Sequence, residues 1–354
     1  MDRYVLDPSA ERLDGPGILD LAYPVVQDWP TPEPVLEALR EAAGLVARYP
    51  HREREVREAL AAYLGREPGE IVPTVGGNGA LDLVSRAWLS GRRVMVPFPA
   101  FWQLVDAPLR YGATLSNPSL LEAGAYERMV AEFAVAGELE AIVLCSPNNP
   151  LGQPLDSGFL DRLLEVSDGR PVIVDESYAD LDGLCAARGE LHPDLVLVRG
   201  FKTFLIPGVR AGYVVASAAR VRQLSQVRPP FEGNVFSEAA ILAVLREIDA
   251  LREVWRQVRS DLRYLEAGLA ALGGEVVPSQ ALFACWRHPQ ALPIARALAS
   301  LRIYVISSER PVIHGMPADM LRLTARRRDV ADTVLFVIRK LLERLASLPQ
   351  GLSA

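Results

Sequence analysis

The chain has 354 residues, of which 50% are hydrophobic and 23% are charged, and its formal net charge is −6. This composition is typical of a globular protein with one large and one smaller domain, and no apolar run is long enough to span a bilayer. Because nucleic-acid phosphates attract concentrated positive charge, the acidic balance argues against a nucleic-acid partner. Cys145, Cys185 and Cys285 show no metal-ligand spacing, so we predict no metal site and a reducing, cytoplasmic setting.

The first part of the chain predicts a proline-rich arm followed by a largely parallel sheet. Residues 1–34 read as an extended arm, and helical spacing follows at 34–45 and 54–64. Short apolar runs then alternate with segments of helix length. The predicted strands are 93–96, 113–115, 141–144, 171–174, 195–198 and 212–216, and the predicted helices are 81–89, 101–109, 126–133 and 158–166. Such strands favour a sheet covered on both faces, whose ligands bind at the carboxyl ends of the strands.

The last third of the chain has a different pattern, which begins after the Pro-Pro-Phe-Glu-Gly run at 229–233. It predicts a long helix, a strand, a helix, two short strands and a closing helix. These elements are expected at 237–272, 275–286, 292–301, near 304, at 321–324 and at 330–345. We therefore predict an α/β protein with a large domain at 35–230. The arm at 1–34 and residues 231–354 are expected to form a smaller α+β domain.

Lys202 is the most informative residue of the chain. An isolated lysine is most often solvated, but Phe201 and Phe204 offer this one apolar cover. Desolvation lowers the pKa of an amine and frees its lone pair for nucleophilic attack. Arg210 follows a Pro-Gly turn in the same segment. A rigid turn of this kind can direct a guanidinium group at a phosphate.

Asp175 ends the apolar strand upstream, and Tyr178 follows it closely. A surface turn is the ordinary reading of such an acid, but the Lys202 segment favours a functional one. A lysine, a phosphate-binding arginine and a strand-end acid suit pyridoxal phosphate. Lys202 would supply the amine for a Schiff base, and Asp175 would stabilise the protonated ring nitrogen. Tyr178 would donate to the ring oxygen.

Three further segments fit the same cofactor. Gly77, Asn78 and Gly79 precede a predicted helix, where backbone N–H groups can face a phosphate; a plain tight turn is the alternative. Asn149 lies in a turn after a strand and could donate to the ring oxygen. Phe101 could stack on the ring, although it and the neighbouring Trp102 could equally belong to the core.

These residues resemble the fold-type I pyridoxal phosphate enzymes of the aspartate aminotransferase class, over roughly residues 45–340. The runs Asn149-Pro150-Leu151-Gly152 and Asp175-Glu176-Ser177-Tyr178 are similar to two motifs of that family. The resemblance implies that Arg322 binds the acidic group of the substrate and that Tyr23 lines the substrate pocket. It also implies that Tyr49 reaches the cofactor of a partner subunit, which means a homodimer with shared active sites.

Within this class, the chain resembles histidinol-phosphate aminotransferases and threonine-phosphate decarboxylases. The implied activity is transfer of an amino group between an amino acid or amino-phosphate donor and a 2-oxo acid acceptor. Phosphoamino-acid decarboxylation is the alternative. A ligand-responsive regulator is a third reading, but no DNA-binding segment accompanies the core.

The chain departs from the family pattern beside the lysine. Arg199 and Phe201 stand where the family has small hydroxyl residues. We hypothesise that Arg199 replaces the missing phosphate contacts with its charge. The Asn-Glu-Asn-Pro signature of histidinol-phosphate aminotransferases is also absent, and Leu21-Ala22-Tyr23-Pro24 stands there instead.

Overall fold

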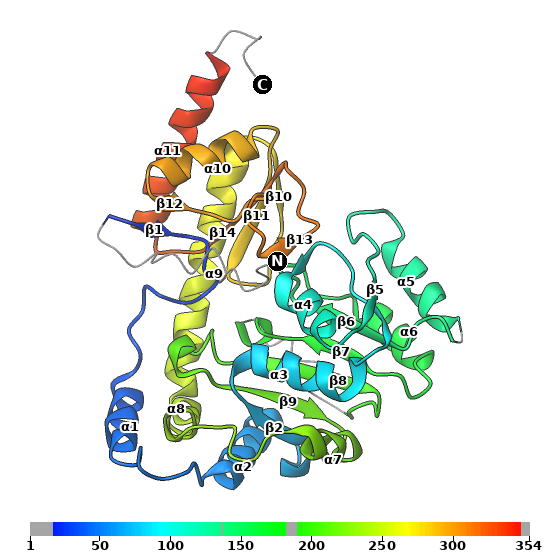
Figure 1. Ribbon diagram of the computed structural model, residues 1–354. Helices are drawn as coiled ribbons and strands as arrows, with labels where there is room; N and C mark the ends of the chain where they lie inside the picture. The colour runs from blue at the N-terminus through cyan, green and yellow to red at the C-terminus, as the bar shows by residue number, and fades with distance from the viewer. Residues whose placement is uncertain (1–16, 136, 182–189, 348–354) are drawn as a thin grey trace.

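The computed structural model describes residues 17–135, 137–181 and 190–347 (Figure 1). Its centre is a seven-stranded sheet in the order β2-β9-β8-β7-β6-β3-β5. The strands are β2 (Ile71–Thr74), β3 (Arg93–Met95), β5 (Thr114–Ser116), β6 (Ala141–Cys145), β7 (Val172–Asp175), β8 (Leu195–Gly200) and β9 (Gly212–Ala216). Only β9 runs antiparallel to its neighbours in this sheet. The prediction of a mostly parallel sheet between helices is therefore confirmed.

Helices cover both faces of the sheet, which explains why its strands are apolar throughout. One face carries α3 (Gly76–Val84), α4 (Trp102–Arg110) and α7 (Ala218–Val227). The other face carries α1 (Glu33–Ala43), α2 (Glu53–Leu64), α5 (Ala125–Ala134), α6 (Ser157–Glu165) and α8 (Val235–Arg246). Alternate residues of β7 enter the two cores: Val172 and Val174 belong to the core that contains α6, whereas Ile173 belongs to the core that contains α3. This alternation decides which strand-end side chains meet at the cavity described below.

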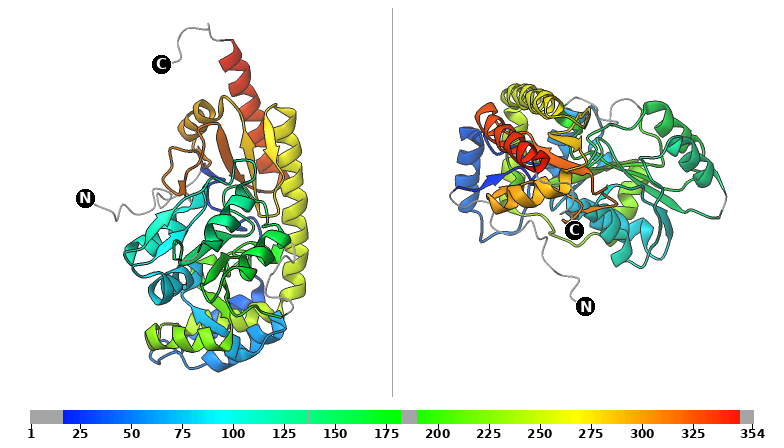
Figure 2. Two further views of the ribbon diagram at one scale, coloured as in Figure 1. Left: turned by 90° about the vertical axis from the view of Figure 1, so that its right-hand side faces the viewer. Right: turned by 90° about the horizontal axis from the view of Figure 1, so that it is seen from above.

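A smaller layer packs at one end of the large sheet (Figure 1). It contains the antiparallel strands β10 (Glu275–Val277), β11 (Phe283–Arg287) and β14 (Met320–Thr324). The helices α10 (Ala291–Ser300) and α11 (Arg328–Ala346) belong to it, and α9 (Ile248–Ala271) runs along both parts of the molecule (Figure 2). One short strand pair ties the two parts together, β4 (Ala100–Phe101) with β13 (Ile313–His314). A second pair, β1 (Leu19–Asp20) with β12 (Ile303–Tyr304), attaches the N-terminal arm to the smaller layer.

The structure corrects several predicted elements. The expected long helix is two helices, α8 and α9, which meet at Glu247. Almost every residue of α8 is buried whereas α9 has one buried stripe, and this change of pattern marked the break. The expected strand at 275–286 is two strands, β10 and β11, separated by residues 278–282. The strand β2 and the helix α7 were missed; β2 is short and contains Pro73, which disfavours a strand assignment.

Within the described residues, no helix is long and apolar enough to cross a membrane. The same part of the chain contains no cluster of His, Cys, Asp and Glu side chains able to hold a metal ion.

Candidate active site

A cavity of about 210 Å³ opens where the carboxyl ends of the parallel strands face the arm at residues 22–25 and strand β14. Most of the predicted site residues line it: Tyr23, Gly77, Asn78, Phe101, Asp175, Tyr178, Lys202, Arg210 and Arg322. Ser177, Ile306 and Val312 also line the cavity, although the sequence patterns assigned them no role. The folded chain thus gathers side chains that are up to 300 residues apart, as in the contact between Arg322 and Ala22.

Lys202 follows β8 and directs its amine into the cavity beside Tyr178. Its Nζ atom donates a hydrogen bond to the Tyr178 hydroxyl at 2.9 Å and lies 4.0 Å from the centre of that ring. Phe201 and Phe204 beneath it are fully buried. Burial raises the pKa of Tyr178, although the charges of Lys202 and Arg322 oppose the rise. The phenol therefore stays protonated at neutral pH and can donate to a ligand.

Asp175 enters the cavity from the carboxyl end of β7. Its Oδ1 atom accepts a hydrogen bond from the Ser177 backbone N–H at 2.9 Å and another from Ser177 Oγ at 2.5 Å. The side chain is 5% exposed and lines the cavity. A carboxylate held in this way can stabilise a cationic ring nitrogen, because an opposite charge favours the charged form.

The other end of the cavity is built to receive an anion. The glycines expected to precede a helix lie inside the first turn of α3, whose first residue is Gly76, and no side chain caps this helix end. Arg210 lies against the same turn, since a Cβ atom on Gly76 would be 2.9 Å from its Nη2 atom. Gly212 packs still closer, because its Cβ would lie 2.3 Å from the Gly76 carbonyl carbon. Uncapped N–H groups beside a guanidinium form a suitable phosphate site.

Arg199 does not lie at this anion site, which corrects the hypothesis that its charge contacts the phosphate. The odd-numbered residues of β8 point toward the core formed with α6 and α8, away from α3. The Arg199 guanidinium is fully buried there, 3.0 Å from Asp180 and 3.7 Å from Glu176. Tyr63 also donates to Asp180 at 2.7 Å. Arg199 therefore holds the loop that follows β7, and its charge is balanced inside the core.

Arg322 lies at the substrate side of the cavity, and Asn149 connects it to Tyr178. The Arg322 guanidinium donates to Asn149 Oδ1 at 2.6 Å and also to the Ala22 carbonyl oxygen. The Asn149 amide nitrogen lies 3.4 Å from the Tyr178 hydroxyl. Although Asn149 is buried and does not line the cavity, it links two groups that do. The guanidinium is thus held in position before any ligand binds, which suits capture of an acidic group.

The arm that carries Tyr23 is fixed by charges from the smaller layer. Asp20 Oδ1 accepts the backbone N–H groups of Ala22 and Tyr23 at 2.7 and 3.1 Å. Arg326 donates to the Asp20 carbonyl oxygen at 2.7 Å and pairs with Asp28 at 2.5 Å. The arm therefore closes the cavity as an anchored segment, with Tyr23 at its wall.

Besides Asn149, two predicted site residues, Gly79 and Tyr49, do not line the cavity. Gly79 faces Val75 and Thr74, since its Cβ would lie 3.4 Å and 4.0 Å from their Cβ atoms. Tyr49 is 73% exposed, and its ring stacks on that of Phe231 at 4.6 Å. Its side chain thus lies at the surface of this chain, away from its own cavity, and could contact only the cavity of a second molecule.

The two described cysteines do not offer a nucleophile. Cys145 and Cys285 are both buried. Burial raises the pKa of the Cys145 thiol well above its ordinary value, and it raises that of Cys285 to about 12. Both therefore remain thiols at neutral pH. Cys185 lies outside the described residues.

Comparisons with known proteins identify the family of the chain. A model of the family "Aminotransferase class I and II" matches residues 22–334. A histidinol-phosphate aminotransferase of Anaeromyxobacter sp. is 31% identical over 324 residues, which cover 88% of each chain. The histidinol-phosphate aminotransferase 2 of Pseudomonas aeruginosa is 31% identical over 325 residues, which cover 87% of this chain and 85% of that one.

Solved structures show the same fold at lower identity. The histidinol-phosphate aminotransferase of Sinorhizobium meliloti, solved with pyridoxal-5'-phosphate, superposes with a TM-score of 0.81 at 20% identity, covering 92% of this chain and 90% of that one. The L-threonine-O-3-phosphate decarboxylase of Porphyromonas gingivalis gives a TM-score of 0.78 at 22% identity and covers 94% of this chain and all of that one.

Proposed function

Because the chain belongs to the class I and II aminotransferases, we propose that its cavity binds pyridoxal phosphate and transfers an amino group from an amino acid or amino-phosphate donor to a 2-oxo acid. The observation that carries this assignment is the placement of Lys202, whose amine faces Asp175, Tyr178 and Arg210 across one cavity. The cavity lies between the large unit proposed for residues 35–230 and the smaller unit proposed for 1–34 and 231–354.

The residues present fit the cofactor at each of its polar groups. Arg210 and the first turn of α3, with Gly77 and Asn78, would hold the phosphate, whereas Gly79 faces away from the cavity. The close approach of Gly212 leaves no room for a side chain at this turn, as a backbone phosphate site requires. Asp175 would hold the ring nitrogen, and Tyr178 with Asn149 would hold the ring oxygen. The centre of the Phe101 ring lies 6.0 Å from Lys202 Nζ, and Phe101 would pack on the ring of the cofactor.

Bound pyridoxal phosphate supplies an aldehyde that reacts with amines and a ring that accepts electrons from the substrate Cα. Lys202 would act as the proton carrier, because its amine can take a proton from the substrate Cα and deliver it to the former aldehyde carbon of the cofactor. Tyr178 keeps this amine in place through its hydroxyl. Arg322 binds the acidic group of the donor, and Tyr23 closes the substrate side and excludes water.

Histidinol phosphate is the amino donor we propose first. The support is the name shared by the relatives at about 30% identity over most of the chain. A cavity with apolar walls from Val312 and Ile306 and a fixed Arg322 suits a donor with a neutral ring and one strongly anionic group.

We also propose a homodimer in which Tyr49 of one subunit reaches the cavity of the other. The exposed stack of Tyr49 on Phe231 supports this, because large apolar rings at a surface favour a partner. A cytoplasmic location and the lack of a nucleic-acid or membrane partner are part of the same proposal. They are supported by the net charge of −6 and by the two buried thiols.

The test is an assay of purified protein with pyridoxal phosphate, histidinol phosphate and 2-oxoglutarate. We expect glutamate to form, and we expect little from a panel of other donors. Transfer from a different donor would keep the aminotransferase and replace its substrate. Release of carbon dioxide from threonine phosphate, with no 2-oxo product, would instead identify the decarboxylase alternative.

A further inference from the structure

Ser177 lies inside the cavity between the strand-end carboxylate and the first turn of α3. It is 4% exposed and lines the cavity. Its Oγ atom donates to Asp175 Oδ1 at 2.5 Å, and its backbone N–H donates to the same oxygen at 2.9 Å. A Cβ atom on Gly77 would lie 3.5 Å from that hydroxyl. Ser177 is therefore in contact range of both the acid and the anion-binding turn.

Two donors on one oxygen constrain the carboxylate. The terminal torsion of an aspartate is broad, so an unsupported carboxylate can rotate. Here both donors hold Oδ1, and Oδ2 has no hydrogen bond within the described part of the chain. Since a hydroxyl has a single proton, Ser177 commits that proton to Asp175. Oδ2 is consequently the oxygen left for a ligand in the cavity.

We infer that Ser177 is a positioning residue for Asp175, which fixes the orientation of the carboxylate and moderates its negative charge toward the cofactor ring. This inference rests on the proposed function, because it concerns the group that Asp175 would hold. A hydrogen bond to a charged group stabilises and disperses the charge. Without the hydroxyl, the carboxylate would keep only the backbone donor, and its charge would act more strongly on nearby cationic nitrogens.

Other titratable groups lie near Asp175, and the Ser177 variants described below leave them unchanged. Cys145 is its cross-strand neighbour on β6, Lys202 follows β8, and Tyr178 follows β7 itself. Arg210 stands before β9 on the far side of the same cavity. A change confined to Ser177 therefore reports on the hydroxyl, provided that none of these groups is altered.

The experiment compares wild-type holoenzyme with Ser177→Ala and Ser177→Thr, and uses Ser307→Ala as the matched control. Ser307 is also 4% exposed but does not line the cavity. Two quantities are measured: the pH midpoint of the absorbance change of bound pyridoxal phosphate, and its dissociation constant by equilibrium dialysis. We expect Ser177→Ala to raise the midpoint by roughly half a unit or more and to weaken binding about three- to tenfold. Ser177→Thr keeps the hydroxyl and should stay near the wild type.

The outcomes separate the two levels of the proposal. If Ser177→Ala has the wild-type midpoint and affinity, the hydroxyl only closes a turn and the inference is overturned. The same holds if Ser307→Ala shifts the midpoint as much, or if Ser177→Thr behaves like Ser177→Ala. If the wild type shows no absorbance band of bound pyridoxal phosphate, the proposed function itself is contradicted, independently of Ser177. The free energy of unfolding in urea should be the same for all variants, which would show that the shift of the absorbance midpoint does not come from a loss of stability.

Discussion

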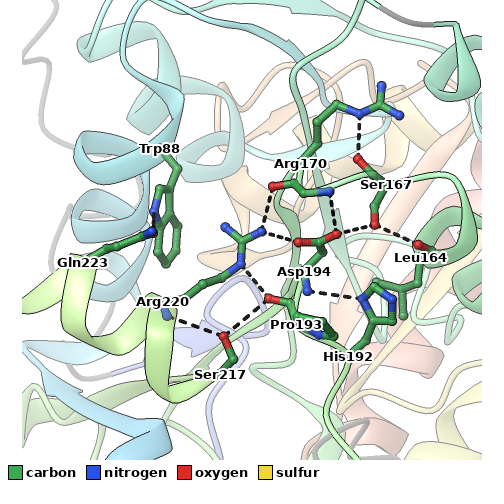
Figure 3. Close-up of polar contacts among 11 residues, drawn as sticks. Trp88, Leu164, Ser167, Arg170, His192, Pro193, Asp194, Ser217, Arg220 and Gln223 are labelled. Carbon is green, nitrogen blue, oxygen red and sulfur yellow. Dashed lines mark hydrogen bonds and ion pairs between the residues drawn. The ribbon is translucent and has the colours of Figure 1, made fainter.

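The two ends of strands β7 and β8 carry buried charges that are used in opposite ways. At the amino ends, Asp194 accepts hydrogen bonds from Ser167 Oγ and Arg220 Nη2 at 2.6 Å each and from the Gly169 N–H at 2.9 Å (Figure 3). Trp88 covers Arg220, whose carbon Cζ lies 5.4 Å from that ring (Figure 3). At the carboxyl ends, Asp175 and Lys202 face an open cavity.

The difference shows how one sheet separates stability from chemistry. Buried polar groups that satisfy one another stabilise the fold and have no capacity left for a ligand. The cavity end leaves an amine, a carboxylate oxygen and two guanidinium groups facing a shared space, a costly arrangement unless a ligand completes it. Arg199 is paired with acidic side chains inside the core although it lies near the cavity end, because its side chain points to the other face of β8.

The largest effect should follow from loss of the cavity amine. Lys202→Ala should lower amino-group transfer about a thousand-fold or more, because it removes the amine proposed to carry the proton. Lys202→Arg should be as inactive, since a guanidinium does not release its proton. Steady-state assays check both, and Lys340→Arg on the exposed face of α11 is the control. Substantial transfer by either Lys202 variant would contradict the assignment.

Removal of the buried Arg199 charge should mainly lower the free energy of unfolding. Arg199→Met removes the ion pairs that Glu176 and Asp180 form with the guanidinium, while the hydrogen bond from the Tyr63 hydroxyl to Asp180 remains. We expect a loss of about 3 to 5 kcal/mol in the free energy of unfolding. Urea denaturation measures it, with Arg110→Met as the control. Arg110 pairs with Asp82 at the surface, so its loss should cost at most about 1 kcal/mol. Equal losses would show that the Arg199 cluster is not a buried network.

A smaller effect is expected where the sheet packs against the anion-binding turn. Gly212→Ala would place Cβ 2.3 Å from the Gly76 backbone, so the turn must move. We expect a loss of about 1 to 3 kcal/mol in stability and weaker binding of pyridoxal phosphate. Gly69→Ala is the control, because nothing lies within 4 Å of its added Cβ. If Gly212→Ala binds the cofactor as the wild type does, the turn is not the phosphate site.

The smallest effect is a change in acid stability at the amino ends of the strands. Burial opposes ionisation of Asp194, but donors from Ser167 and Arg220 outweigh it and lower its pKa below the ordinary 3.8. A lowered folded-state pKa stabilises the protein above 3.8, and this contribution is lost as the pH falls through the folded value. Asp194→Asn should therefore flatten the pH dependence of unfolding below about pH 4. Urea titrations from about pH 3 to pH 7 measure the free energy of unfolding at each pH. If Asp194→Asn and the wild type show the same slope of this free energy against pH, the pKa of Asp194 is not lowered by folding.

Much of the fold could be read from sequence because its local signals agree. The apolar runs of β6, β7 and β8 are short, continuous and followed by turn residues, and this pattern predicts buried parallel strands. The break between α8 and α9 at Glu247 was missed because helix-forming residues continue on both sides of it. It depends on the packing of α8 against α1 and α2, which is a tertiary property.

The candidate site was predicted in part for a similar reason. Strand-end position brought Asp175 and Lys202 together, because the carboxyl ends of neighbouring parallel strands share one edge. The direction of Arg199 depended on the pleat, and alternation along β8 could have shown that it faces away from Gly76. Ser177 was already within the motif, but its hydrogen bond to Asp175 depends on the turn geometry. One further signal was available: of 38 basic residues, only Lys202 and Lys340 are lysines.

Because the chain has only two lysines, a chemical label can show directly whether Lys202 forms the Schiff base. Purified protein is mixed with pyridoxal phosphate, reduced with borohydride, digested and mapped by mass spectrometry. We expect a pyridoxyl label on the peptide that contains Lys202, and none on the peptide that contains Lys340. A label on Lys340 alone, or no label on either lysine, would contradict this expectation.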